Sequence, residues 1–234
     1  MRGRTSAIGL AVVALALMAC APTFQTRRTD VRVALERLVV LPPFVQDVLV
    51  DAQDEPTPDL ATAAATEAAV RGALRRFAVA HGARVLETPD LASYPSAAHE
   101  TFNAFYRWAQ RTIAGTAAQI TGRHDFHLRS VADWHLEEDP APIAATLRAE
   151  TALLVVVSNT RRTFGRQLQG LVGAYTPWRA LCAACLFSLT DGRPIWCDAR
   201  ADAWDELRDP VTAAAAVREI LNGLDATMTL TARR

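Results

Sequence analysis

The sequence predicts a single α/β domain: a mixed β-sheet of about five strands flanked by helices, ending in a β-hairpin and a helix. Short β-branched apolar runs alternate with longer segments whose apolar residues recur at helical spacing. The run "TALLVVVS" (151–158) is apolar almost throughout, as in a strand covered on both faces. Two further strands around "TDGR" (190–193), followed by a helix, complete a pattern typical of the α/β class.

The first half of the chain supplies a strand, a helix and a second strand. "RLVVLPPF" (37–44) is a strand that we expect to stop at its prolines, because proline cannot donate to a β-ladder. Residues 60–81 form a helix capped by Asp59, and a strand at 83–88 follows. The apolar face of that helix is expected to hold Leu60, Ala64, Ala68, Leu74, Phe77 and Val79.

Three further helices are predicted in the rest of the chain. One at 97–120 presents aromatic side chains at spacings of three and four residues, and a short one at 140–150 leads into the apolar strand. Asp209 caps the last helix, which extends to residue 224. The expected core residues of the 97–120 helix are Phe102, Phe105, Trp108, Ala109, Thr112 and Ile113.

The amino terminus predicts export and a lipid anchor. Two arginines precede an uncharged apolar run (7–19), which is shorter than the roughly 18 to 20 residues of a spanning helix and typical of a signal peptide. "LMAC" (17–20) resembles the lipobox of bacterial lipoproteins, which implies acylation of Cys20 and cleavage before it. The alternative is an ordinary signal peptide that contains a cysteine. We expect a signal peptide at 1–19, a lipidated tether at 20–34 and a periplasmic α/β domain at 35–230.

The lipobox resemblance also implies a location. Ala21 stands where an aspartate usually retains lipoproteins at the inner membrane, so the resemblance favours the outer membrane, with the domain facing the periplasm. Several acyl chains form an effectively permanent anchor, because each buried methylene contributes roughly 0.8 kcal/mol. The predicted partners are the membrane, through Cys20, and an envelope protein.

Charge argues against a nucleic-acid partner. The chain without residues 1–19 has 23 basic and 25 acidic residues, a formal charge of −2. Nucleic-acid binding normally requires a clustered basic excess. No motif in the sequence predicts a cofactor, and the residues do not reveal the oligomeric state.

The hairpin predicts a cross-strand disulfide. A three-residue loop with Gly192 in the left-handed conformation pairs Cys185 with Cys197. Such a pair can oxidise in the periplasm, although a loop one residue longer or shorter would separate the two cysteines.

From residue 134 to residue 224 the order of features resembles uncharacterised bacterial lipoproteins. The matching pieces are "WHL", "TALLVVV", "RTFGRQ", the hairpin "LTDGRPIW" and "ELRDPVTAAAAVREIL", with T-D-G where these relatives usually have T-G after an aspartate. More distantly, the chain looks like periplasmic α/β domains of the curli-secretion lipoprotein and the amino-terminal domain of TolB. The resemblance implies binding of other envelope proteins.

Catalytic and metal motifs are weak. His124, His127 and His135 are the basis of an alternative, a metal-dependent hydrolase, but two of these histidines point to opposite faces if "FHLRSV" is a strand. Cys182-x-x-Cys185 lies within a strand, unlike redox pairs at helix starts. We therefore expect no enzyme activity and no bound metal; a small-ligand carrier is a further alternative.

The segment 160–178 is the candidate partner-binding loop. Long ordered loops in compact domains are often functional, and exposed apolar ones tend to mark contact sites. The alternative is an extra hairpin or a loop folded over its own sheet. The apolar residues expected to bind a partner are Leu168, Leu171, Val172, Tyr175 and Trp178.

Overall fold

A computed structural model of the chain describes residues 23–27, 37–51, 56–86, 93–120, 136, 139–162, 180–202 and 207–232. The strands among these residues are β1 (Thr23–Arg27), β2 (Leu38–Val40), β3 (Phe44–Val50), β4 (Pro56–Pro58), β5 (Arg84–Val85), β6 (Thr151–Arg162), β7 (Ala180–Ser188) and β8 (Pro194–Asp202). They form one mixed sheet in the order β1-β8-β7-β6-β2-β5, with β3 between β6 and β4.

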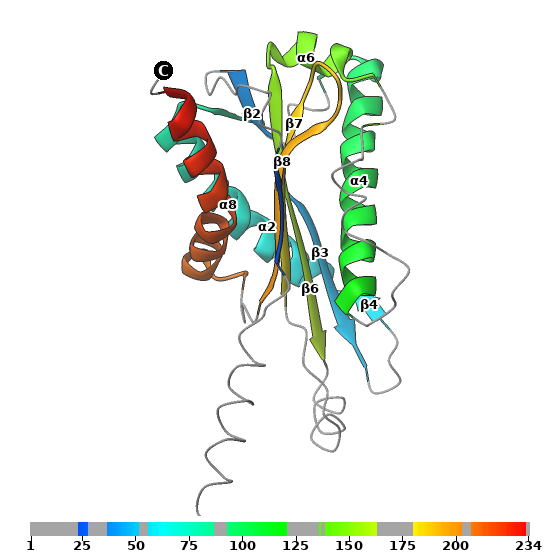
Figure 1. Cartoon of the computed structure of the whole chain (residues 1–234). Coiled ribbons are helices and arrows are strands. Elements are labelled where there is room, and N and C mark those ends of the chain that lie inside the picture. The colour runs from blue at the N-terminus through cyan, green and yellow to red at the C-terminus, as the bar shows by residue number, and fades with distance from the viewer. Residues whose placement is uncertain are drawn as a thin grey trace, which may run out of the picture.

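Helices cover both faces of this sheet, as the edge-on view of Figure 1 shows. Helices α2 (Leu60–His81) and α8 (Pro210–Ala232) pack on one face, and α4 (Ser96–Ile120) and α6 (Ala141–Leu147) pack on the other. The predicted α/β domain with a mixed sheet is confirmed. The described residues contain eight strands rather than about five, because β1, β3 and β4 were not predicted.

The prolines separate two strands that pair with the same neighbour. β2 pairs in parallel with residues 151–153 of β6, and after Pro42 and Pro43 the chain resumes as β3, which pairs in parallel with residues 156–162 of the same strand. The first strand therefore stops before the prolines, as expected, and what was not predicted is the second strand that follows them. Pro42 and Pro43 cannot donate to the ladder, but Leu41 N still donates to Leu153 O at 2.9 Å, and β6 offers a continuous edge on which pairing can restart.

Part of the expected tether belongs to the sheet. Residues 23–27, within the 20–34 segment assigned to a tether, form β1 and pair antiparallel with β8 from Arg200 to Trp196. Because nothing in "TFQTR" distinguishes it from a polar linker, only the neighbouring strand edge makes it a strand. The sheet begins three residues after Cys20.

Helix α2 has the predicted bounds but turns a different face to the core. Leu60 and Val79, expected to be buried, are 78% and 82% exposed. Alanines surround the helix on all sides, so the apolar spacing does not select one face. The buried residues are Thr66, Ala69, Val70, Ala73, Leu74 and Ala78.

Helix α4 packs its aromatic side chains as predicted. Phe102, Phe105 and Trp108 are buried on the face of the sheet that carries Phe187. The Phe187 ring meets those of Phe105 and Trp108 edge to face, at centroid distances of 5.1 and 5.0 Å. Such aromatic pairs contribute about 0.5–1.5 kcal/mol beyond their buried area.

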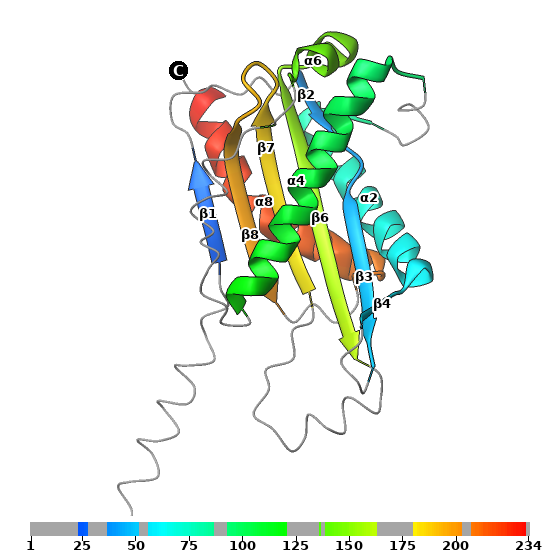
Figure 2. The same ribbon diagram turned by 90° about the vertical axis from the view of Figure 1, so that its right-hand side faces the viewer.

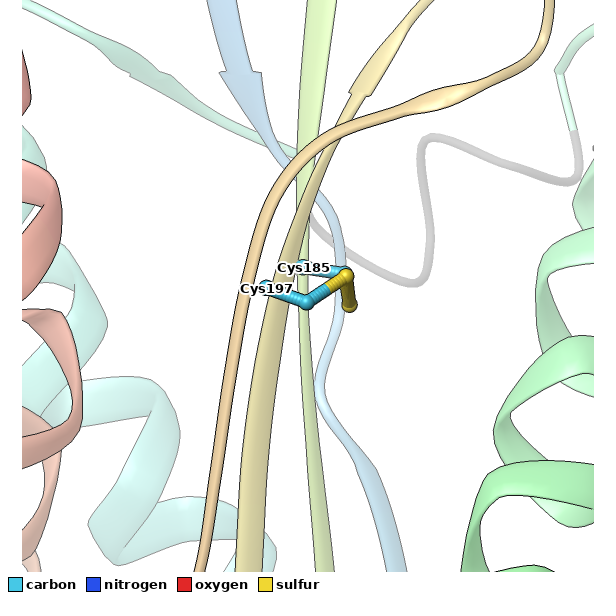
Figure 3. The surroundings of a disulfide bond; sticks show 2 residues. All are labelled: Cys185 and Cys197. Atoms are coloured by element: carbon cyan, nitrogen blue, oxygen red, sulfur yellow. A yellow bond between two sulfur atoms is a disulfide. The ribbon is translucent and has the colours of Figure 1, made fainter. Parts of the chain in front are cut away.

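The β7–β8 hairpin positions the two cysteines. Gly192 has φ +68°, as a left-handed turn requires, and its carbonyl accepts a 2.9 Å hydrogen bond from Leu136 N. A Cβ at Gly192 would lie 3.3 Å from the Leu136 Cβ, so the close approach also favours glycine. Cys185 lies opposite Cys197 at a Cα separation of 4.2 Å, and a disulfide joins them on the α4 face (Figure 3).

Candidate functional site

Most of the residues singled out in the sequence lie outside the described residues. Cys20, the three histidines at 124, 127 and 135, and the partner-binding residues Leu168, Leu171, Val172, Tyr175 and Trp178 all fall in this group. The first three residues of the proposed loop, 160–162, are the end of strand β6. The described parts of the chain contain no group of three or more residues suited to hold a metal ion. None of the helices described is long and apolar enough to cross a membrane.

The register of the strands shows which strands extend furthest at one end of the sheet. Thr23 pairs with Arg200, Arg200 with Cys182, and Cys182 with Val157. From that row β6 continues for five residues to Arg162, about 17 Å at roughly 3.3 Å per residue. Figure 2 shows β3 and β6 extending beyond the start of β1.

We call this region the β3–β6 end. It consists of the last residues of β3 (48–50), all of β4 (Pro56–Pro58) and the last residues of β6 (160–162). Strand β6 ends here, at Arg162. The next described residue is Ala180 of β7, which pairs with Asn159.

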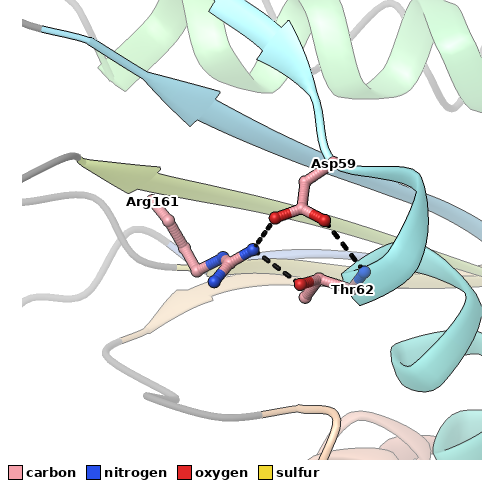
Figure 4. A network of polar contacts seen from close by, with 3 residues as sticks. All are labelled: Asp59, Thr62 and Arg161. Atoms are coloured by element: carbon pink, nitrogen blue, oxygen red, sulfur yellow. Dashed lines mark hydrogen bonds and ion pairs between the residues drawn. The ribbon is translucent and has the colours of Figure 1, made fainter.

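A polar network attaches the start of helix α2 to the β3–β6 end (Figure 4). Asp59 caps the helix by accepting a 3.0 Å hydrogen bond from Thr62 N. The Arg161 guanidinium, from β6, forms an ion pair with the other oxygen of Asp59 and donates a 2.6 Å hydrogen bond to Thr62 Oγ1. The hydrogen bond from Thr62 N is the main reason why the pKa of Asp59 lies below its ordinary value.

Asp47 is a buried carboxylate close to this network. Its side chain projects from β3, which pairs Asp47 with Asn159 of β6, and only 2% of the residue is exposed. Burial raises the pKa of Asp47, while the nearby Asn159, Thr66 and Arg161 side chains lower it by less. Among the described residues, none forms a hydrogen bond of acceptable geometry with either carboxylate oxygen.

A second buried carboxylate lies on the same face of the sheet, under helix α8. Asp198 is 1% exposed, and Arg200 donates to it at 3.4 Å and to Glu219 of α8 at 2.7 Å. Burial raises the pKa of Asp198, and the charge of Arg200 opposes that increase. Asp198 therefore has a charged partner, which Asp47 lacks at hydrogen-bond distance.

Cys182, a free cysteine, lies near this second cluster. It is 1% exposed, and burial raises the pKa of its thiol to about 12. A thiol with that pKa is not ionised at neutral pH and is a poor nucleophile. Cys182 faces the α2/α8 core while Cys185 faces the α4 core, so the C-x-x-C pair does not converge.

Sequence reasoning missed both polar clusters. Asp47 interrupts the apolar "FVQDVLV", and Asn159 ends "TALLVVVSN", so each polar residue within an apolar strand was an available signal. Such a residue indicates a buried polar contact, because unpaired burial is costly. Asp47 and Asn159 lie on different strands, so whether they meet depends on the register between β3 and β6.

Comparison with known proteins assigns no family. No protein-family model matches the chain, and no curated protein matches it. Among solved structures, the PelC dodecamer from Paraburkholderia phytofirmans has a TM-score of 0.37 and 11% identity, covering 88% of this chain and 97% of that one. A single-substitution variant of that dodecamer has a TM-score of 0.36 and 11% identity, covering 88% and 99%. A likeness at this level of similarity is not evidence of a shared function.

Proposed function

We propose that this chain is a lipid-anchored domain of the bacterial cell envelope that binds another envelope protein and has no catalytic activity of its own. The lipobox-like "LMAC" is the basis for the anchor and for a periplasmic domain at the outer membrane. A disulfide between Cys185 and Cys197 supports export, since such bonds persist in oxidising compartments.

One structural observation carries the binding proposal. Residues 163–179 connect Arg162, at the β3–β6 end, to Ala180 of β7, and the network of Arg161, Asp59 and Thr62 holds strand and helix together beside that connection. A long segment on a rigid support is a common arrangement in binding proteins. Its apolar side chains, including Leu171 and Trp178, supply the contact surface that we propose.

Crosslinking in living cells, followed by affinity purification and mass spectrometry, tests this proposal on the chain with Cys20 intact. We expect one dominant envelope partner for the natural sequence and its loss in the Leu171→Asp, Trp178→Asp double variant. Leu60→Asp and Val79→Asp are the matched control, since both side chains are already exposed. A partner that persists in the loop variant contradicts the loop assignment, and the absence of any enriched partner contradicts the binding function.

A further inference from the structure

The position of β1 restricts how the domain sits on its membrane. Three residue steps separate Cys20 from Thr23, the first residue of the sheet. An extended chain covers at most about 3.6 Å per residue, so the cysteine lies within about 11 Å of Thr23. If Cys20 carries acyl chains in the bilayer, the start of β1 therefore lies close to the headgroups.

The β3–β6 end lies on the same side of the domain as the start of β1. β6 continues for about 17 Å beyond the row of Thr23, which exceeds the reach of the three-residue connection. Figure 2 shows the tips of β3 and β6 extending in the direction opposite to the β7–β8 turn. With the strands pointing towards the bilayer, this end reaches the headgroups at least as deeply as the backbone of Cys20.

The β3–β6 end combines apolar and charged groups. Val48, Leu49 and Val50 are half-buried at the tip of β3, and the whole of β4 is exposed. Strand β6 ends in Arg161, whose guanidinium is paired with Asp59, and in Arg162. The connection from β3 to β4 contains Asp51, Asp54 and Glu55. The apolar side chains at the tip of β3 are the part of this end that favours a lipid interface, because burying apolar area in the headgroup region stabilises binding.

We propose that the β3–β6 end lies against the lipid headgroups of the membrane that holds Cys20, with the β7–β8 turn pointing away from it. This inference rests on the proposed lipid anchor. It places the attachment points of segment 163–179 at the membrane surface, so an envelope protein bound through that segment is one embedded in, or lying on, the same membrane.

Fluorescence quenching by lipids tests this orientation. The mature, acylated chain is reconstituted in phosphatidylethanolamine and phosphatidylglycerol vesicles that contain nitroxide-labelled headgroups. A fluorescent amino acid replaces Thr57, in the exposed β4, or Val79, which is 82% exposed near the far end of α2. Leu60, 19 residues before Val79 in α2, provides a third position up to about 29 Å from it along the helix.

We expect the nitroxide lipids to remove most of the fluorescence at Thr57, part of it at Leu60 and little of it at Val79. Equal quenching at Thr57 and Val79, or stronger quenching at Val79, overturns the orientation. Vesicle flotation and the mass of the acylated amino terminus are measured on the same samples. Protein that floats with an unquenched Thr57 probe contradicts the orientation alone, whereas a chain without acyl groups contradicts the anchor and the orientation together.

Discussion

The two faces of the sheet are stabilised by different means, although the same strands supply both. The α4 face packs the rings of Phe105, Trp108 and Phe187 beside the Cys185–Cys197 disulfide. The α2/α8 face has Trp196 as its fully buried aromatic residue among those described, together with alanine and branched aliphatic side chains.

The two faces also differ in the charged residues that they bury. Among the described residues, the two buried aspartates, Asp47 and Asp198, both lie on the α2/α8 side, facing helices α2 and α8. Each loses hydration on folding, which costs free energy unless a partner replaces the lost water. The difference teaches that aromatic packing and a disulfide stabilise the α4 face, while the α2/α8 face gives up some stability to bury two carboxylates.

The largest expected effect is on the α4 face. Phe187→Ala removes a fully buried ring from between Phe105 and Trp108 and should lower the free energy of unfolding by about 3–5 kcal/mol. Phe187→Leu is the control, since it keeps most of the volume and should cost less than about 1.5 kcal/mol. Urea unfolding measures both. A loss below 1 kcal/mol for the alanine variant, on the scale of a minor repacking, would show that this face does not depend on its aromatic cluster.

Removal of the disulfide should give the next largest loss of stability. The bond closes a short loop, its cysteines being 12 positions apart, and loss of such a link should cost about 3 kcal/mol by the loop-entropy estimate. The variant is Cys185→Ser with Cys197→Ser, and its unfolding midpoint should no longer respond to a reducing agent. Cys182→Ala is the matched control, because its thiol is free and faces the other core. If the natural chain unfolds at the same midpoint with and without reductant, the disulfide has no stabilising role.

The smallest effect comes from Asp47 and has the opposite sign. Because burial raises its pKa, the folded chain binds this proton more tightly than the unfolded chain does. The contribution of Asp47 to stability therefore falls as pH rises from the unfolded pKa, near 3.9, towards the higher folded value. Asp47→Asn should stabilise the domain by about 1 kcal/mol at pH 7 and by little below about pH 3.5.

Asp198→Asn is the control for that prediction. It removes a charged partner of Arg200 at 3.4 Å, so we expect a smaller gain than for Asp47→Asn, or a loss. Urea unfolding of both variants between pH 3 and pH 7 measures the difference. A destabilised Asp47→Asn variant at pH 7 would mean that the Asp47 carboxylate has an effective partner and that the two buried carboxylates do not differ.

Local patterns were sufficient for the elements with strong signals. The bounds of α2 and the helical region of α4 follow from apolar spacing and caps, and Asp191-Gly192 with its neighbours predicts both the turn and the pairing of Cys185 with Cys197. These features depend on residues a few positions apart, whose preferences act within one helix turn or one hairpin. The face of α2 was not predictable in this way, since alanines do not distinguish its sides.

By itself the sequence determined the α/β class, the hairpin and the expectation of a lipid anchor. Only the tertiary structure decided that β1 and β3 join the sheet, because a polar or proline-flanked segment becomes a strand when a neighbouring edge offers it hydrogen bonds. It likewise decided the contact of Arg161 with Asp59, 102 positions apart, and the burial of Asp47 beside Asn159. Such contacts follow from strand register, which is set by the packing of the whole sheet.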